Sequence, residues 1–218
     1  MIVGFTGPAG CGKDTAADIL VSTRGFRKES FATNLYREVS DAFGVSVDRL
    51  SNRATKELPM VGLEATLCDD LGFVEVLQHV DPEFDWHKPY SPRQILQWWG
   101  TDYRREQDED YWVRPVRCRV LAAQQQDRIL RQEKSWAFAD VRRRNEADLA
   151  YELSGSVPGA LVVVERDVEA VAKHKTEAFW ATCTPDYRLD NRHDLDQTRS
   201  NLSAILDAHI AAQKRLIG

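Results

Sequence analysis

The sequence predicts an α/β fold in which a parallel sheet of five strands is flanked by helices. Two observations lead to this prediction. Strand-like and helix-like segments alternate along the chain, the order that builds a parallel sheet through helical crossovers. In addition, residues 160–164 (ALVVV) form a continuous β-branched run, typical of a strand buried on both faces. The other four strands are expected at residues 2–5, 27–31, 135–139 and 187–189.

Capping residues mark several of the expected helices. Ser91 followed by Pro92 is a helix start, and we expect this helix to end at Gly100. Asp194, with Gln197 three residues later, resembles the start of a C-terminal helix. Further helices are expected from residue 14, at 32–43 with Gly44 as the stop, at about 110–131 with Pro115 in the first turns, and at 145–153.

A length of 218 residues fits one domain spanning residues 1–218. Residues 45–90 combine polar turns, Pro59, a helical stretch at 63–79 and an acidic, aromatic segment. They are predicted to form a helical insertion. No apolar run approaches the roughly 20 residues of a membrane span, and no signal peptide is visible, so we expect a cytoplasmic protein without a membrane partner.

Charge and cysteine usage narrow the class of protein further. The net charge of −5 argues against a long nucleic acid as the main partner. The four cysteines are widely spaced and form no C-x-x-C pair or His/Cys cluster. They are therefore expected to be free thiols, and zinc has no support.

The chain begins with an apolar strand, a glycine-rich segment and an alanine-rich helix. This is the context of the G-x-x-x-x-G-K phosphate-binding loop, with Lys13 as its lysine. Glycines let backbone N–H groups approach phosphate oxygens, and the start of the helix favours an anion. A nucleoside triphosphate site is predicted, and a glycine-rich structural turn is the alternative. Its predicted residues are Gly7, Gly10, Cys11, Gly12, Lys13, Asp14 and Thr15.

Asp14 stands where Ser or Thr usually follows the lysine to hold Mg²⁺. A carboxylate beside a triphosphate is repulsive unless a cation lies between them. We therefore expect Asp14 to hold the metal or orient a water, with Thr15 providing the hydroxyl. The alternative is that Asp14 only caps the start of the helix.

Ligands of an open parallel sheet bind at the carboxyl ends of its strands. Asp140 follows the third strand and is expected to hold Mg²⁺ through water, with a turn-forming role as the alternative. Arg142 is expected near an anion, because a guanidinium is rarely buried unpaired. Arg143 and Arg144 are expected to be solvated or paired with Glu146 and Asp148. Strands four and five are followed by Arg166 and Asn191, and Asn191 is predicted to contribute to the ATP site.

Four motifs in order resemble the bacteriophage deoxynucleoside monophosphate kinases. They are GKDT at 12–15, SPRQILQWWGTDYRRE at 91–106 followed by DYWV at 110–113, ADVRRRNEAD at 139–148, and HKTE at 174–177. The resemblance covers residue 1 to about 43 and residue 91 to about 206. Within the insertion, only RATKE at 53–57 resembles an element of that family. One departure concerns the second helix, where the family often has Pro-Leu-Lys and this chain has Asn-Leu-Tyr at 34–36, followed by Arg37.

The resemblance implies a P-loop phosphotransferase of the nucleoside monophosphate kinase fold, which uses ATP and Mg²⁺. It implies a helical acceptor-side insertion at 45–90 and a short lid at 165–180 that contains Arg166, Lys173, His174 and Lys175. The implied catalytic residues are Lys13, Asp14, Arg142 and Arg166. The implied acceptor-binding residues are Arg37, Arg53, Lys56, Arg105, Asp140 and Arg142, of which Arg105 and Arg142 clamp the monophosphate. The implied metal-binding residues are Asp14, Thr15 and Asp140.

The expected reaction is ATP-dependent phosphorylation of a (deoxy)nucleoside 5′-monophosphate to the diphosphate. The acceptor phosphate is itself the nucleophile, so no general base is required. Two alternatives stay open. One is a P-loop kinase of another small phosphorylated acceptor, such as dephospho-coenzyme A or phosphomevalonate, and the other is a nucleotide-dependent switch or ATPase. A homodimer, and the host cytoplasm if the chain is of phage origin, also stay open.

Overall fold

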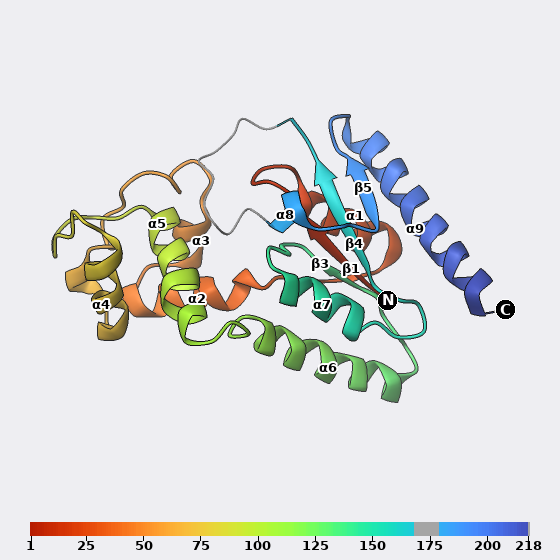
Figure 1. Ribbon diagram of the computed structural model, residues 1–218, viewed down its shortest axis with the longest axis horizontal. Coiled ribbons are helices and arrows are strands. Elements are labelled where there is room, and N and C mark those ends of the chain that lie inside the picture. Colours follow the sequence, from red (N-terminus) through yellow and green to blue (C-terminus); the bar gives the residue numbers. More distant parts are fainter. Residues whose placement is uncertain (168–178, 218) are drawn as a thin grey trace. The chain divides into compact units, whose positions relative to one another are not determined.

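The computed structural model describes residues 1–167 and 179–217. Its strands form a five-stranded sheet of order β2-β3-β1-β4-β5, in which every neighbouring pair is parallel. The predicted α/β fold with five parallel strands is therefore confirmed (Figure 1). The strands are β1 (Ile2–Thr6), β2 (Arg27–Glu29), β3 (Trp136–Phe138), β4 (Ala160–Glu165) and β5 (Tyr187–Asp190).

The central strand β1 is buried along its whole length, as its apolar sequence requires. Val3 and Phe5 pack in one core cluster with Leu20 of helix α1 (Lys13–Arg24) and Leu202 of α9 (Leu195–Ile217). Gly4 points to the opposite face, where a Cβ would lie 3.8 Å from Ala150 of α7 (Arg144–Glu152). Alternate residues of β1 thus contact helices on the two faces of the sheet.

The chain divides into two compact units, residues 1–31 with 115–218 and residues 32–114. The first unit contains the sheet, and the predicted insertion at 45–90 lies within the second. Two more helices complete the described part of the first unit: α8 (Phe179–Thr182), and α6 (Val113–Leu130), which begins at the end of the second unit. The predicted lid at 165–180 falls largely on residues 168–178, outside the described residues.

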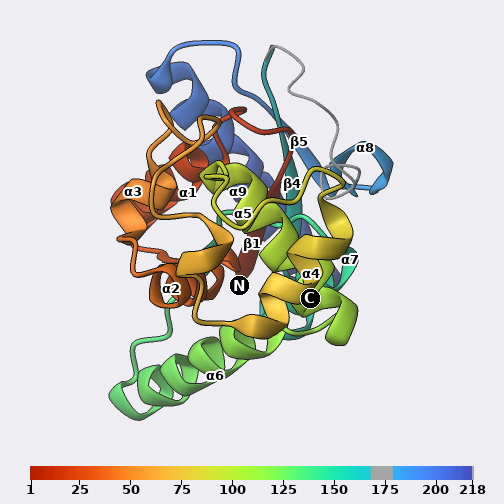
Figure 2. The ribbon, with the colours of Figure 1, turned by 90° about the vertical axis from the view of Figure 1, so that its left-hand side faces the viewer.

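The second unit is helical (Figure 2). It has its own hydrophobic core. Its elements are α2 (Ala32–Phe43), α3 (Val47–Ser51), the 3₁₀ turn η1 (Ala65–Leu67), α4 (Leu71–Val80), α5 (Pro92–Gln97) and the π-helix η2 (Trp98–Arg105). The helix expected at 63–79 is shorter than predicted. It starts only at Leu71 because Asp70 caps it, accepting a hydrogen bond from Phe73 N at 3.1 Å.

The predicted start of α5 is confirmed, and its predicted end is wrong. Ser91 and Gln94 form a reciprocal capping box, with Pro92 in the first turn. The helical backbone then continues through Gly100 into η2, which ends at Arg105. Gly100 serves close packing and does not stop the helix. A Cβ there would lie 3.2 Å from Leu35, and Gly100 O accepts a hydrogen bond from Trp112 Nε1 at 3.0 Å.

Strand β2 is shorter than the predicted 27–31. Phe31 N donates to the side chain of Asp140, and Ser30 N donates to the side chain of Glu29, so neither amide joins the sheet. At the start of α9, Asp194 Oδ1 accepts from Gln197 N at 2.8 Å, which confirms the predicted cap.

The four cysteines are free thiols, as expected from their spacing. Among the described residues, no helix is both long enough and apolar enough to cross a membrane.

Candidate active site

The glycine-rich loop connects β1 to α1, and its backbone requires glycine at three positions. Gly7, Gly10 and Gly12 have φ angles of 144°, 78° and 101°, in the region that side chains disfavour. A Cβ on Gly7 would also lie 2.6 Å from Val164 O. Helix α1 begins at Lys13, so its first amides are at the loop. This is the backbone arrangement that the phosphate-loop prediction requires.

Lys13 bends back over this loop. Its Nζ donates to Gly7 O at 2.9 Å and to Pro8 O at 2.8 Å. The Sγ atom of Cys11 lies 3.8 Å from the same ammonium. Burial raises the pKa of the Cys11 thiol despite this neighbouring charge. The loop therefore holds a cation and a neutral thiol, and Cys11 has no activated thiolate.

A hollow opens beside the loop at the carboxyl ends of β1 and β3. It is lined by Thr6, Gly7, Ala9, Lys13, Val141, Arg142 and Trp180. Two of these side chains, Lys13 and Arg142, are cationic, so the hollow attracts anions. Arg142 was expected near an anion because of burial. Its side chain is instead exposed, and within the described residues it makes no ion pair. Trp180 is the last residue of the predicted lid at 165–180, and no role was predicted for its side chain.

Glu146 fixes the backbone that carries Arg142. It is 1% exposed, and its Oε2 accepts hydrogen bonds from Arg142 N at 2.6 Å and Arg143 N at 3.1 Å. Glu146 therefore contacts Arg143 through the main chain, because these amides at the start of α7 need an acceptor. The position of Glu146 near the expected start of a helix is the sequence feature that could have indicated this capping role. The predicted pair of Arg144 with Asp148 is confirmed at 2.9 Å.

Asp140 ties the end of β3 to the end of β2. Its Oδ1 accepts from Phe31 N at 2.9 Å, and its Oδ2 accepts from Ser30 Oγ at 2.7 Å. The described residues contain no group of three or more His, Cys, Asp or Glu side chains arranged to hold a metal.

Asp14 lies within the first turn of α1. The N-cap residue is Gly12, so the alternative in which Asp14 caps the helix is wrong. Its exposed carboxylate forms an ion pair with Lys28 Nζ at 3.1 Å. Burial lowers the pKa of Lys28, but hydrogen bonds with Asp18 and Asp14 outweigh it, and the pKa is raised overall. Thr15, beside Asp14, is exposed.

Asn191 follows β5 and reaches the loop from the side of the sheet. Its side-chain Nδ2 donates to Cys11 O at 2.7 Å, and its Oδ1 accepts from Thr198 Oγ1 at 2.8 Å. The side chain of Asn191, a predicted ATP-site residue, therefore contacts a backbone carbonyl of the loop.

The remaining predicted site residues are less constrained. Arg166 is exposed after β4. In the second unit, Arg37 and Arg53 are exposed, and Lys56 Nζ hydrogen-bonds Tyr36 Oη. The acceptor-side roles of these second-unit residues and of Arg105 stay predictions. The implied lid residues Lys173, His174 and Lys175, and Glu177 of the HKTE motif, lie outside the described residues.

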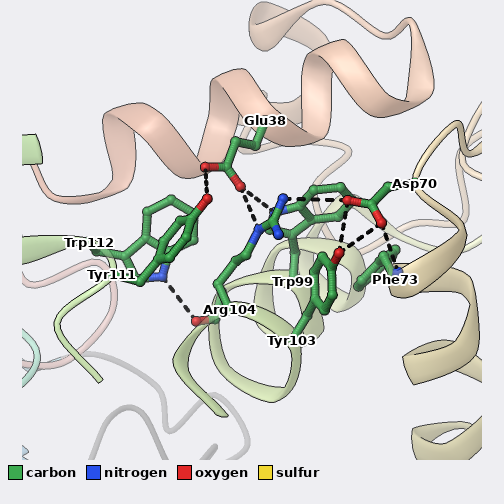
Figure 3. Close-up of polar contacts among 9 residues, drawn as sticks. Glu38, Asp70, Phe73, Trp99, Tyr103, Arg104, Tyr111 and Trp112 are labelled. Carbon is green, nitrogen blue, oxygen red and sulfur yellow. Dashed lines mark hydrogen bonds and ion pairs between the residues drawn. The ribbon is translucent and has the colours of Figure 1, made fainter. Parts of the chain in front are cut away.

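A charged and aromatic network fixes η2 within the second unit (Figure 3). Glu38 of α2 accepts hydrogen bonds from Trp99 Nε1 at 2.9 Å, Arg104 Nε at 2.9 Å and Tyr111 Oη at 2.8 Å. The Arg104 guanidinium also lies 4.3 Å from the centroid of the Tyr103 ring. Arg104 is thus committed to this network, whereas the neighbouring Arg105 is half-buried and donates to Glu109 O at 3.2 Å.

Comparison with known proteins gives a distant relative. A protein of Acanthamoeba polyphaga mimivirus, provisionally named a deoxynucleotide monophosphate kinase, is 26% identical over 160 residues. The match spans 71% of this chain and 70% of that protein. No family model matches the sequence. Dephospho-CoA kinase from Campylobacter jejuni aligns over 94% of this chain and 95% of its own, with 14% identity and a TM-score of 0.42, too low to carry a conclusion.

Proposed function

We propose that the protein transfers the γ-phosphoryl group of ATP to a (deoxy)nucleoside 5′-monophosphate and releases the two diphosphates. The observation that carries the proposal is the hollow at the carboxyl ends of β1 and β3. There the glycine loop, Lys13 and Arg142 lie together at the edge of the sheet where ligands of this fold class bind. The order of the four sequence motifs and the name of the mimivirus relative support the choice of acceptor.

The loop residues fit a bound triphosphate. Gly7 leaves no room for a Cβ, and the loop amides at the start of α1 present N–H donors to an anion. Lys13, which now donates to two loop carbonyls, exchanges these neutral acceptors for phosphate oxygens when the triphosphate binds.

The oxygen donors of Asp14 and Thr15 lie in the first turn of α1 beside the loop, and oxygen is the ligand atom that Mg²⁺ prefers. They fit the metal, with Asp140 as a further contact through water. Bound Mg²⁺ neutralises charge on the phosphate oxygens during transfer. Arg142 then binds the acceptor phosphate, holds it in line with the donor and stabilises the charge on the transferring group. The hydrogen bonds of Glu146 keep the Arg142 backbone in place.

The test is ADP release from Mg²⁺–ATP in the presence of a panel of acceptors. The panel contains the deoxynucleoside and nucleoside monophosphates, dephospho-coenzyme A and phosphomevalonate, with a reaction lacking any acceptor. At least one nucleoside monophosphate should stimulate ADP release and appear as its diphosphate. Lys13→Ala is the matched inactive control, because the Lys13 ammonium is expected to bind phosphate and its side chain is not part of the buried core, so its loss should leave the fold intact.

Two results would contradict this proposal. If only dephospho-coenzyme A or phosphomevalonate stimulates ADP release, the protein is a kinase, but its acceptor is not a nucleoside monophosphate. ATP hydrolysis that no acceptor stimulates would point to a switch or ATPase.

A further inference from the structure

The strongest unexplained contact in the site is the buried amide of Asn191. Its residue is 8% exposed, and both ends of the amide are occupied, Nδ2 by Cys11 O and Oδ1 by Thr198 Oγ1. The main-chain N of Asn191 donates to Glu165 O at 2.8 Å, which fixes the residue to the end of β4. A residue held at three points, two on its side chain and one on its main chain, is well suited to set the position of the loop carbonyl that it contacts.

The oxygen and nitrogen of this amide are assigned by its partners. Cys11 O can only accept a hydrogen bond, so the group facing it must be Nδ2. The hydroxyl of Thr198, which is 1% exposed, has one proton and two acceptors within reach, Asn191 Oδ1 at 2.8 Å and Asp194 O at 2.9 Å. When it donates to Asn191 Oδ1, Thr198 holds the amide in the orientation that directs Nδ2 at the loop.

Through Cys11 O, the amide controls the Cys11–Gly12 peptide. In a trans peptide the C=O and N–H groups point in opposite directions, and the described chain contains no cis peptide. When Asn191 draws Cys11 O toward the end of β5, the Gly12 N–H must point to the opposite side. Gly12 N–H donates to no group in the described residues, so it remains available to a ligand.

Gly12 and Asn191 are also matched in shape. A Cβ on Gly12 would lie 2.2 Å from Asn191 Nδ2, closer than any real contact, and the φ of 101° disfavours a side chain as well. The second invariant position of the loop motif is thus glycine in this chain because the amide occupies the space of its side chain.

We propose that Asn191 is a positioning residue for the phosphates of the bound triphosphate. It holds Cys11 O so that Gly12 N–H is directed at a phosphate oxygen, and Thr198 keeps the amide in register. The inference rests on the proposed function only in that a nucleoside triphosphate occupies the loop. It concerns the donor phosphates and is independent of which acceptor is used.

The experiment compares variants that leave the net charge unchanged, by calorimetric titration with ATP and with inorganic tripolyphosphate. Asn191→Leu keeps the approximate shape and removes both polar ends. Thr198→Val and Thr198→Ser form a matched pair, since only the serine keeps the hydroxyl. In Asn191→Leu, Gly12 N–H is no longer directed at a phosphate oxygen, and one charge-assisted hydrogen bond is lost. The affinity for ATP and for tripolyphosphate should then fall by about 10-fold, and by a smaller factor in Thr198→Val. Thr198→Ser should bind as the original chain does, and the KM for the acceptor at saturating ATP should not change.

A merely structural role predicts another pattern. In that case the variants would lower the thermal midpoint, yet bind ATP and tripolyphosphate with unchanged Kd well below it, and the inference would be overturned. If Asn191→Leu does not fold, the Thr198 pair decides between the two roles. An original chain that binds ATP but phosphorylates no monophosphate would reject the proposed function and leave this inference standing. One that binds neither ATP nor tripolyphosphate would reject both.

Discussion

The ammonium nitrogen of Lys28 lies 3.1 Å from Oδ1 of Asp14, so the carboxylate predicted to hold Mg²⁺ already has a protein cation beside it. The same ammonium lies 2.9 Å from Oδ1 of Asp18, one turn further along α1. Both carboxylates project from one side of the helix toward β2. If Asp14 holds Mg²⁺ as proposed, we expect Mg²⁺ and Lys28 to compete for its carboxylate when a triphosphate occupies the loop.

This competition predicts opposite shifts in the Mg²⁺ concentration that gives half-maximal turnover. Asp14→Asn should raise that concentration because a metal ligand is lost. Lys28→Met should lower it because the competing cation is gone. Asp18→Asn is the control, since it removes a partner of Lys28 one turn away from the loop, and it should shift the titration least. Identical Mg²⁺ titrations for all four proteins would remove Asp14 from the metal site.

Arg142 should act on the acceptor and hardly on the donor. Arg142→Ala removes a charge-assisted interaction with the acceptor phosphate, of about 1.5–3 kcal/mol, which corresponds to roughly 10- to 150-fold in kcat/KM for the acceptor. Arg144→Ala is the matched control, because this exposed arginine of the same segment is paired with Asp148. ATP binding without acceptor should be nearly unchanged in both. Equal losses in ATP binding and acceptor use would place Arg142 on the donor side.

Trp180 should report ligand binding, because it lines the hollow with Lys13 and Arg142. Adding ATP or tripolyphosphate should change the tryptophan fluorescence of the protein, and Trp180→Phe should lose most of that change. Trp86→Phe is the control, since Trp86 is an exposed residue of the other unit, and its variant should keep the signal. A full signal in Trp180→Phe would separate this side chain from the ligand.

Alkaline pH should destabilise the network around Glu38. Burial, followed by the hydrogen bond to Glu38, raises the pKa of Tyr111 above its ordinary value of 10.0. The unfolded tyrosine loses its proton near pH 10 while the folded one keeps it. The stabilisation is therefore complete below about pH 10 and is lost as the pH rises through the higher folded pKa.

The measurement is the thermal midpoint between about pH 8 and about pH 11.5. Tyr111→Phe should have a lower midpoint at neutral pH, because Glu38 loses a hydrogen-bond donor. Above about pH 10 its midpoint should fall less steeply than that of the original chain. Parallel curves at all pH values would show that the Tyr111 hydroxyl does not link folding to pH.

Local patterns were enough to predict the five strands in their order, although β2 is shorter than expected, and to predict the helix start at Ser91. The run from Ala160 to Val164 is buried on both faces as its composition indicates, and the Ser91 cap forms with its reciprocal partner. Gly100 misled because a glycine that stops a helix and one that allows close packing look alike in a sequence. Deciding between them requires knowing that Leu35, 65 residues earlier, packs against it.

The same limit applies to the site. The glycine loop is local and was predicted as a unit, with its lysine. Asn191 lies 180 residues from the carbonyl it holds, and only the sheet order brings them together. The burial of Glu146 was not predicted, since the sequence does not tell which side of α7 faces the interior. Roles that depend on the direction of a side chain, such as those of Asn191 and Glu146, could be recognised only from the structure.

The order of the sheet also has a consequence for synthesis. Strand β1 pairs with β3 and β4, so the partners of Val3 are Ala137 and Ala160. On the ribosome β1 must therefore remain without its neighbours while more than 130 residues are added, and residues 32–114 can acquire their own core in that interval. The glycine loop acquires its last contact later still, because the side-chain amide that holds Cys11 O belongs to Asn191. If the loop binds a triphosphate as proposed, we expect this binding to arise late in synthesis, after the early stages of folding.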